Sequence, residues 1–240
     1  MAKSKKLLPE NFQHVYDRFQ ASISRYDCGK KCAPLNGGSP VCCSTDAAVP
    51  IAHKSEWKLL KSRTDLWHRF KPYDAVTRDI VADASDECTA IECKGARFCE
   101  RDNRTIACRA FPFYPYITRE GDFIGLACFW EFEDRCWVIS NFSTVNRSFV
   151  REFVAAHEYL FEQDPQEKEY ASNQSLSARR VFSRWKRVIP LIGRDGGYLK
   201  ELPHGGGIVK ARLSEFPAHG PYVSDRAYRR AVKEAEDAAG

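Results

Sequence analysis

The stretch Cys99-Glu-Arg-Asp-Asn-Arg-Thr-Ile-Ala-Cys108-Arg109-Ala110-Phe111-Pro112-Phe113 links two cysteines through eight residues and then enters an aromatic segment that contains a proline. The sequence around it, residues 97–140, alternates short β-prone runs with the turn signals Asp102-Asn103 and Glu120-Gly121-Asp122. The β-prone runs cover residues 105–108, 123–126 and 136–139. We therefore expect the cysteines of this region to lie on or beside short antiparallel strands.

Amphipathic helices are expected on both sides of these strands. Apolar residues repeat at helical spacing over residues 12–23, in a helix that should stop near Cys28-Gly29, and over residues 145–161, where Asp164-Pro165 should end the helix. Residues 28–43 are predicted to form a loop, and residues 55–70 are predicted to form one or two short helices. Further on, the sequence predicts a basic helix at 177–189, a hairpin of runs 198–202 and 208–213, and a last helix from Ser224.

Cysteine and charge divide the chain into two regions. All ten cysteines lie between positions 28 and 136, whereas the excess of basic residues lies in the C-terminal part. Residues 1–164 carry 23 Lys and Arg against 23 Asp and Glu, and residues 165–240 carry 14 against 9. We predict an α+β fold with a small cysteine-rich, metal-centred domain over residues 1–164, in which amphipathic helices flank short antiparallel strands. Residues 165–240 form a basic helical and hairpin region that is able to pack on it.

The number and setting of the cysteines favour metal binding. Ten cysteines in 240 residues are fewer than secreted disulfide scaffolds carry, and no apolar leader segment follows the basic N-terminus. We expect a cytoplasmic protein with no membrane partner, in a reducing compartment where clustered cysteines bind metal more often than they cross-link. Four thiolates around one centre are typical of structural zinc and of iron–sulfur clusters.

The pair Cys42-Cys43, followed by a short apolar segment, together with the C-x8-C-R-x-F-P element that ends at Pro112, resembles the YkgJ-type cysteine-cluster family. That family is described as zinc- or iron-chelating and is similar to the cysteine-rich part of flagellin lysine-N-methylase. The resemblance covers about residues 28–130. It departs from the family pattern because nine residues separate Cys32 from Cys42. The metal ligands that it implies are Cys28, Cys32, Cys42, Cys43, Cys93, Cys99, Cys108 and Cys128.

Several assignments stay open at this level. The departure from the family pattern leaves open which of Cys28 and Cys32 is a ligand, and whether Cys88 or Cys93 is the nearer partner. Cys136, between β-prone neighbours, is equally well explained as a small buried hydrophobic residue. We expect an iron–sulfur cluster, of the [4Fe-4S] type, with Zn²⁺ as the alternative, because aromatic residues near the cysteines would shield a cluster from solvent. Arg109, directly after Cys108, is the expected cofactor-binding cation, unless its place on a strand turns it to solvent.

Three classes of function remain, and the sequence does not decide whether the protein is an enzyme. The first is a cluster protein of the YkgJ type with a redox or modification role. The second is an S-adenosylmethionine-dependent methylase similar to the lysine-N-methylase. The third is a zinc-stabilised module that binds nucleic acid or protein. In the third class, the binding surface would be the basic face of the C-terminal helix, although a solvated helix face explains these residues better. The residues are Arg179, Arg180, Arg184, Lys186 and Arg187.

Overall fold

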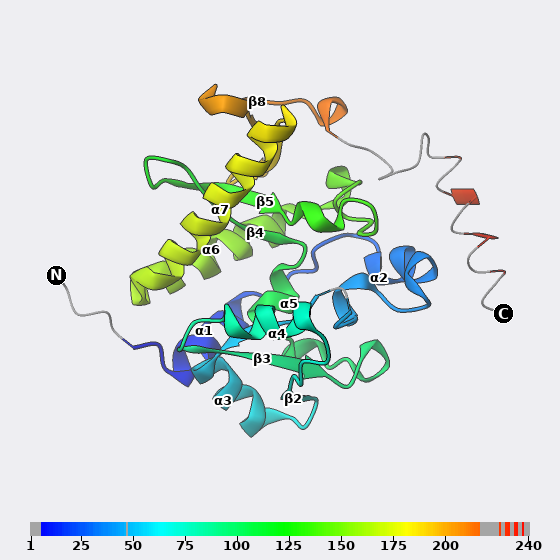
Figure 1. The fold of residues 1–240 in the computed structure, drawn as a ribbon, viewed down its shortest axis with the longest axis vertical. Coiled ribbons are helices and arrows are strands. Elements are labelled where there is room, and N and C mark those ends of the chain that lie inside the picture. The colour runs from blue at the N-terminus through cyan, green and yellow to red at the C-terminus, as the bar shows by residue number, and fades with distance from the viewer. Residues whose placement is uncertain are drawn as a thin grey trace.

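The computed structural model describes residues 6–46, 48–216, 226, 229–230, 233–234 and 237. Its helices surround two antiparallel sheets, one of three strands and one of five (Figure 1). The predicted α+β class with antiparallel strands is thereby confirmed. In the described part of the chain, no helix has both the length and the apolar character that crossing a membrane requires.

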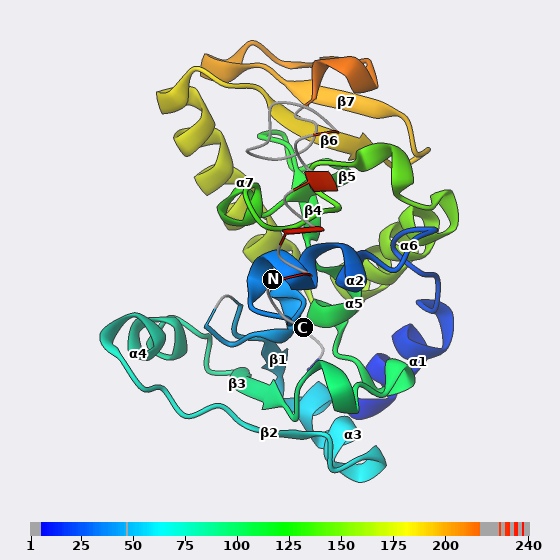
Figure 2. The same ribbon diagram turned by 90° about the vertical axis from the view of Figure 1, so that its right-hand side faces the viewer.

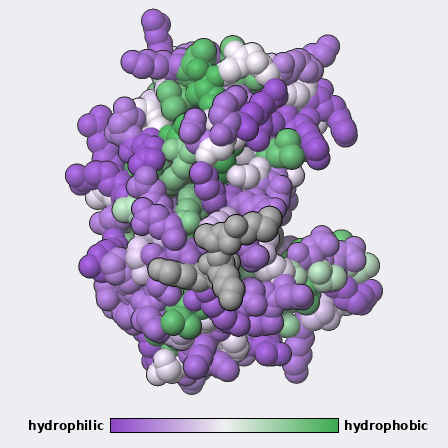
Figure 3. Space-filling view, turned by 90° about the vertical axis from the view of Figure 1, so that its left-hand side faces the viewer, coloured by the Kyte–Doolittle hydropathy of each residue, from purple (hydrophilic) through white to green (hydrophobic). Residues whose placement is uncertain are grey.

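The three-stranded sheet lies in the N-terminal half and has the order β1-β3-β2. Helix α1 packs against α3, and the buried side of α1 consists of Phe12, Val15 and Tyr16. Helix α4 projects from the rest of the molecule (Figure 2; Figure 3). The elements of this half are α1 (Pro9–Arg18), β1 (Ile51–His53), α3 (Lys54–Arg63), β2 (Trp67–Arg69), α4 (Ala75–Ala82) and β3 (Cys88–Cys93).

The five-stranded sheet follows the chain in the order β4-β5-β6-β7-β8, with two long helices inserted between β5 and β6. Successive residues face opposite sides, so Phe113 and Leu126 join the main core, whereas Tyr114 and Ala127 pack with Phe182 of the second long helix. Strands from both sides of residue 164, the predicted boundary, share this sheet. The elements are β4 (Phe113–Ile117), β5 (Phe123–Cys128), α6 (Arg147–Gln163), α7 (Pro165–Trp185), β6 (Ile189–Gly193), β7 (Tyr198–Glu201) and β8 (Ile208–Lys210).

The cysteine-bearing segments lie between the two sheets and are more helical than expected. Helix α2 (Cys28–Cys32) and the 3-10 turns Ala33–Asn36 and Val41–Cys43 replace the predicted loop. Helix α5 (Ile106–Ala110) replaces the strand predicted at 105–108, because the Thr105 side chain caps it by accepting a hydrogen bond from the Cys108 N–H (3.0 Å). Both helices lie in the middle of the molecule (Figure 1; Figure 2). The remaining 3-10 turns are Ala96–Phe98, Arg101–Asn103, Trp130–Phe132, Phe142–Thr144, Pro203–Gly205 and Leu213–Glu215.

Three other boundaries differ from the sequence-based expectation. Helix α1 stops at Arg18 because the Glu152 carboxylate on α6 accepts hydrogen bonds from the backbone N–H groups of Gln20 and Ala21. Ser24 then pairs with Val145. Helix α7 begins at Pro165 rather than near residue 177, since the Asp164 side chain caps it. The strand predicted at 136–139 is a turn, in which the Cys136 N–H donates to the Phe132 carbonyl (2.8 Å).

The other predictions are largely confirmed. Residues 55–70 contain one helix, α3, followed by the strand β2, and residues 123–126 lie in β5. Strands β7 and β8 form the expected hairpin around Pro203–Gly205. The start of the last helix, predicted at Ser224, lies outside the described residues.

Candidate metal centre

A cavity of about 810 Å³, which we call the cysteine cavity, opens between α2, β3 and α5. Six of the eight cysteines predicted as ligands line it. They come from segments far apart in the sequence, and all ten cysteines of the chain are free thiols. The six lining cysteines are Cys28, Cys42, Cys43, Cys93, Cys99 and Cys108.

Four of these thiols are associated with one half-buried arginine, Arg104, which the sequence analysis overlooked. Its Nε donates a hydrogen bond to the Cys99 Sγ at 3.0 Å. Burial disfavours the charge of Arg104, but this bond and the charges of Cys99, Cys108 and Cys43 outweigh burial and raise its pKa. The fourth thiol is Cys28, where the charge of Arg104 opposes the rise of the pKa that burial causes. Cys93 interacts electrostatically with Cys43 and Cys99. The sequence contained one signal for Arg104, its position near the middle of the C-x8-C element.

The vicinal thiols of Cys42 and Cys43 are in contact, with the two sulfurs 4.0 Å apart. The hydrogen bond from Cys42 lowers the pKa of Cys43 to about 7, with help from the charge of Arg104. The same hydrogen bond, together with burial, raises the pKa of Cys42. Cys43 is therefore the thiol best prepared to act as a thiolate, the form that binds metal.

The other thiols of the cavity resist ionisation. Burial raises the pKa of Cys108 to about 12 and that of Cys28 to about 11. Burial also raises the pKa of Cys93. Such thiols stay protonated at neutral pH unless a metal ion takes the place of the proton, which is how a bound metal stabilises a buried thiolate.

The cysteine cavity is electropositive. Five of its lining residues are basic and two, Asp27 and Glu92, are acidic. An excess of positive charge beside buried sulfur favours an anionic occupant, since a buried negative charge is costly without nearby cations. The basic lining residues are Arg25, Lys30, Arg97, Arg101 and Arg104.

The two remaining predicted ligands lie outside the lining of this cavity. Cys32 is buried, and its Sγ donates to the Gly29 carbonyl at 3.7 Å. Cys128, at the end of β5, is buried in the main hydrophobic core, as is Cys136. Cys88, whose role the sequence left open, begins β3 and lines a different cavity. The structure therefore brings six of the predicted cysteines together and places Cys128 apart from them.

Arg109 occupies a different environment from the one expected. It lies on helix α5 instead of a strand, and its guanidinium lies over the Tyr16 ring, 4.4 Å from the centroid. Its three guanidinium nitrogens donate to the backbone carbonyls of Phe19 (2.6 Å), Asp102 (2.7 Å) and Arg104 (3.0 Å). Arg109 thus ties α5 to the end of α1, while Arg104 supplies the cation that contacts a cysteine.

The basic residues predicted on the C-terminal helix do not form one exposed face. Arg179 is buried, and its Nη1 donates to the Ile117 carbonyl at 2.7 Å. Arg187 pairs with both carboxylate oxygens of Glu133 at 2.9 Å. Arg180, Arg184 and Lys186 are exposed. Including Arg179 in a surface that binds a partner was therefore wrong, because its guanidinium is used inside the protein.

The thiols of the cysteine cavity are spread around its wall. Among the described residues, no three His, Cys, Asp or Glu side chains are grouped so that they could hold a metal ion.

A scan against protein-family models and searches of curated proteins and of solved structures found no match to this chain. The resemblance to the YkgJ-type family therefore stays a prediction from the sequence.

Proposed function

We propose that the chain is a cysteine-ligated metal-cluster protein and that the cysteine cavity holds an iron–sulfur cluster of the [4Fe-4S] type. The proposed ligands are Cys43, Cys93, Cys99 and Cys108. The observation that carries the proposal is that these thiols, from separate segments, line one cavity together with Arg104. Cysteine thiolates are the usual ligands of such clusters. Cys28 and Cys42, which line the same cavity, are the alternative ligands.

The spread of the thiols favours a polynuclear cluster over a single zinc ion. Zinc bound by four thiolates at about 2.3 Å requires sulfurs about 3.8 Å apart. The Cys42 and Cys43 sulfurs approach this separation at 4.0 Å, but no three candidate ligands among the described residues are grouped in this way. A cubane distributes its four cysteines over four iron atoms, so its ligands stand around a larger space. A cavity of about 810 Å³ suits that arrangement.

The charge of the cavity agrees with such an occupant. Four thiolates on a doubly charged cubane core give a net charge of about −2, which is costly in a low-dielectric interior. The basic residues of the cavity, above all Arg104, would offset that charge. A bound cluster would supply electron transfer, with a potential that depends on the hydrogen bonds to its sulfurs. The protein's own contribution is to hold the thiols and to place the Arg104 donor on Cys99.

Anaerobic purification followed by iron, zinc and labile sulfide analysis tests the proposal. We expect about four iron and about four sulfide per chain, with a broad absorption band near about 400 nm. A colourless protein that contains zinc and no iron would overturn the iron–sulfur assignment and favour a zinc-stabilised binding module. Full-length, folded protein that retains neither metal after iron reconstitution would overturn metal binding at this site altogether.

A further inference from the structure

A second cavity, of about 490 Å³, lies against the cysteine cavity, and we call it the apolar cavity. Cys42, Ala48, Pro50 and Cys108 line both cavities, so they form a shared wall. Its volume falls within the range of small-molecule sites, about 300–1,000 Å³. Most of the lining is apolar, with aromatic rings that include Phe12, Phe111, Phe113 and Phe129.

The polar groups of the apolar cavity include two carboxylates with unused hydrogen-bonding capacity. Glu56 is almost fully buried (3% exposed), and its Oε1 accepts both of its hydrogen bonds, from the Tyr16 hydroxyl and from the Ile106 N–H, each 2.7 Å long. The other oxygen, Oε2, accepts none of these bonds. The Glu167 side chain has no hydrogen-bond or ion-pair partner in the part of the chain that the structure describes. The charge of Arg109 acts on Glu56, whereas none of the groups that act on the half-buried Glu167 is a cation. A carboxylate removed from water without a cation is costly, so these two groups favour a cationic ligand.

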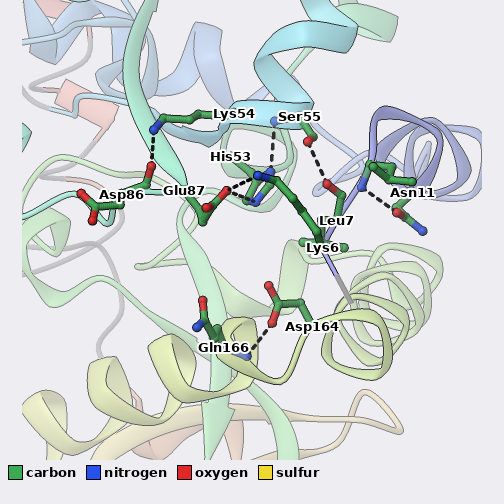
Figure 4. A network of polar contacts seen from close by, with 11 residues as sticks. Lys6, Leu7, Asn11, His53, Lys54, Ser55, Asp86, Glu87, Asp164 and Gln166 are labelled. Atoms are coloured by element: carbon green, nitrogen blue, oxygen red, sulfur yellow. Dashed lines mark hydrogen bonds and ion pairs between the residues drawn. The ribbon is translucent and has the colours of Figure 1, made fainter. Parts of the chain in front are cut away.

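The two histidines of the lining are neutral. The His157 Nδ1 lies 2.8 Å from the Phe153 carbonyl, so this nitrogen carries the hydrogen and Nε2 is left as an acceptor. Burial lowers the pKa of His157 to about 4. The His53 Nδ1 accepts a hydrogen bond from the Ser55 N–H, and its Nε2 lies 4.0 Å from the Glu87 carboxylate (Figure 4). Burial lowers the pKa of His53 as well.

The charge balance of the lining identifies the kind of ligand. None of the described lining residues is Lys or Arg, whereas Glu56, Glu167 and His157 all offer acceptors. Aromatic faces also attract cations. We propose that the apolar cavity binds a small hydrophobic amine, whose protonated nitrogen meets the acceptors of Glu56 and Glu167 and whose apolar body lies among the phenylalanines.

This inference does not depend on the proposed metal cluster. The cavity is built from protein side chains alone, and the carboxylates that would select the amine lie outside the set of proposed metal ligands. The shared wall formed by Cys42 and Cys108 nevertheless brings the two sites into contact. Metal content measured on the same protein samples keeps the two proposals separate, since either one can fail while the other holds.

Calorimetric titration with 4-phenylbutylamine and its neutral counterpart 4-phenylbutanol tests the proposal on the full-length protein. We expect the amine to bind at least about tenfold more tightly than the alcohol, and the anion 4-phenylbutyrate to show no binding. Equal affinity for the amine and the alcohol would overturn the cationic selection. Absence of amine binding at millimolar concentration would overturn the site.

Variants on helix α7 locate the binding. Glu167→Gln removes a carboxylate of the cavity, and we expect it to weaken amine binding at least about tenfold while leaving the weak binding of the alcohol unchanged. Glu169→Gln, an exposed residue two positions away, is the matched control and should bind the amine as the wild type does. Equal effects of the Glu167 and Glu169 substitutions would mean that the amine binds elsewhere.

Discussion

The cysteine cavity and the apolar cavity share a wall but have opposite electrostatic character. The first is lined by six cysteines and by five basic residues against two acidic ones. The second is lined mainly by apolar residues, with two glutamates and no Lys or Arg among its described lining. Because both lie next to the same core, burial does not distinguish them. This difference indicates that the charge of the lining determines the kind of ligand that fits each cavity. The cysteine cavity fits an anionic metal–sulfur centre, and the apolar cavity fits an organic cation.

The largest expected effect comes from removing a thiol of the shared wall. Cys108→Ser should reduce bound iron at least about threefold, because serine is a poor substitute for a thiolate ligand of iron. Cys128→Ser is the matched control, since Cys128 is also buried but lies in the main hydrophobic core. The control should keep its metal and lose about 1–3 kcal/mol of unfolding free energy. Metal analysis and urea unfolding measure the two effects, and full iron occupancy in Cys108→Ser would exclude that thiol as a ligand.

The next prediction concerns the stability that the protein loses when the two carboxyl groups of the apolar cavity ionise. Burial raises the pKa of Glu56 from 4.5 to about 7, and burial with the charges of Asp164 and Glu56 raises that of Glu167 to about 7. Between these values the folded protein binds more protons than the unfolded chain does. These two carboxyls should therefore lower the unfolding free energy by about 3 kcal/mol each as pH rises from about 4.5 to about 7. His157, whose pKa is lowered from 6.5 to about 4, contributes a change of similar size in the opposite direction between those two values.

Glu167→Gln should remove part of this pH dependence. At pH 8 the variant should be more stable than the wild type by about 1–3 kcal/mol, because an uncharged amide replaces a carboxylate that has no cation beside it. Urea unfolding at pH 5 and pH 8 gives the comparison, and Glu169→Gln should behave as the wild type. A Glu167→Gln variant whose stability changes between pH 5 and pH 8 by the same amount as that of the wild type would contradict the role of this carboxyl group.

A smaller effect separates the two arginines of the α5 region. Arg104→Gln removes the donor to the Cys99 Sγ and should weaken metal retention or shift the reduction potential of the centre. Arg109→Gln removes hydrogen bonds to three backbone carbonyls and should cost about 1–3 kcal/mol of unfolding free energy, with an unchanged absorption spectrum. The reverse outcome, a changed spectrum in the Arg109 variant alone, would restore the role that the sequence suggested for Arg109.

The sequence grouped the cysteines more closely than it predicted the backbone that carries them. All six cysteines that line the cysteine cavity belong to the eight that the family resemblance implies as ligands, and their binding of metal stays a prediction. The helix α5 was missed because Thr105 and Ile106 look β-prone, whereas in the structure the Thr105 side chain caps a helix. Cys128, which the resemblance implied as a ligand, lies in the main hydrophobic core instead of the lining of this cavity, because sequence does not tell which face of a sheet the end of a strand joins.

The apolar cavity had no counterpart in the sequence analysis. Its acceptors come from α3, α6 and α7, where they are carried by Glu56, His157 and Glu167. No local pattern joins residues so far apart, and each of them alone reads as an ordinary helix or strand residue. The packing of α6 and α7 beside the N-terminal half brings these acceptors together. The apolar cavity can therefore be recognised from the structure but not from the sequence.

The smallest effect tests the charge of the apolar cavity directly. The titratable groups around its carboxylates are Tyr16 and Arg109 beside Glu56, and Asp164 and Cys88 beside Glu167. Burial raises the pKa of Cys88, so this thiol stays neutral below pH 8. Among these groups, the carboxyls of Glu56 and Glu167 therefore change charge between pH 6 and pH 8. Cys43, whose pKa is also about 7, lines the cysteine cavity instead.

Amine affinity should follow that change in charge. A carboxyl with a pKa of about 7 is ionised in about one tenth of the molecules at pH 6 and in about nine tenths at pH 8, while an alkylamine stays protonated throughout. The affinity for 4-phenylbutylamine should rise about tenfold over this range, equivalent to about 1.4 kcal/mol, and the affinity for 4-phenylbutanol should stay constant. Calorimetry at the two pH values measures both ligands. An amine affinity independent of pH would mean that neither glutamate meets the ligand's charge, and the contrast between the two cavities would then rest on their thiols alone.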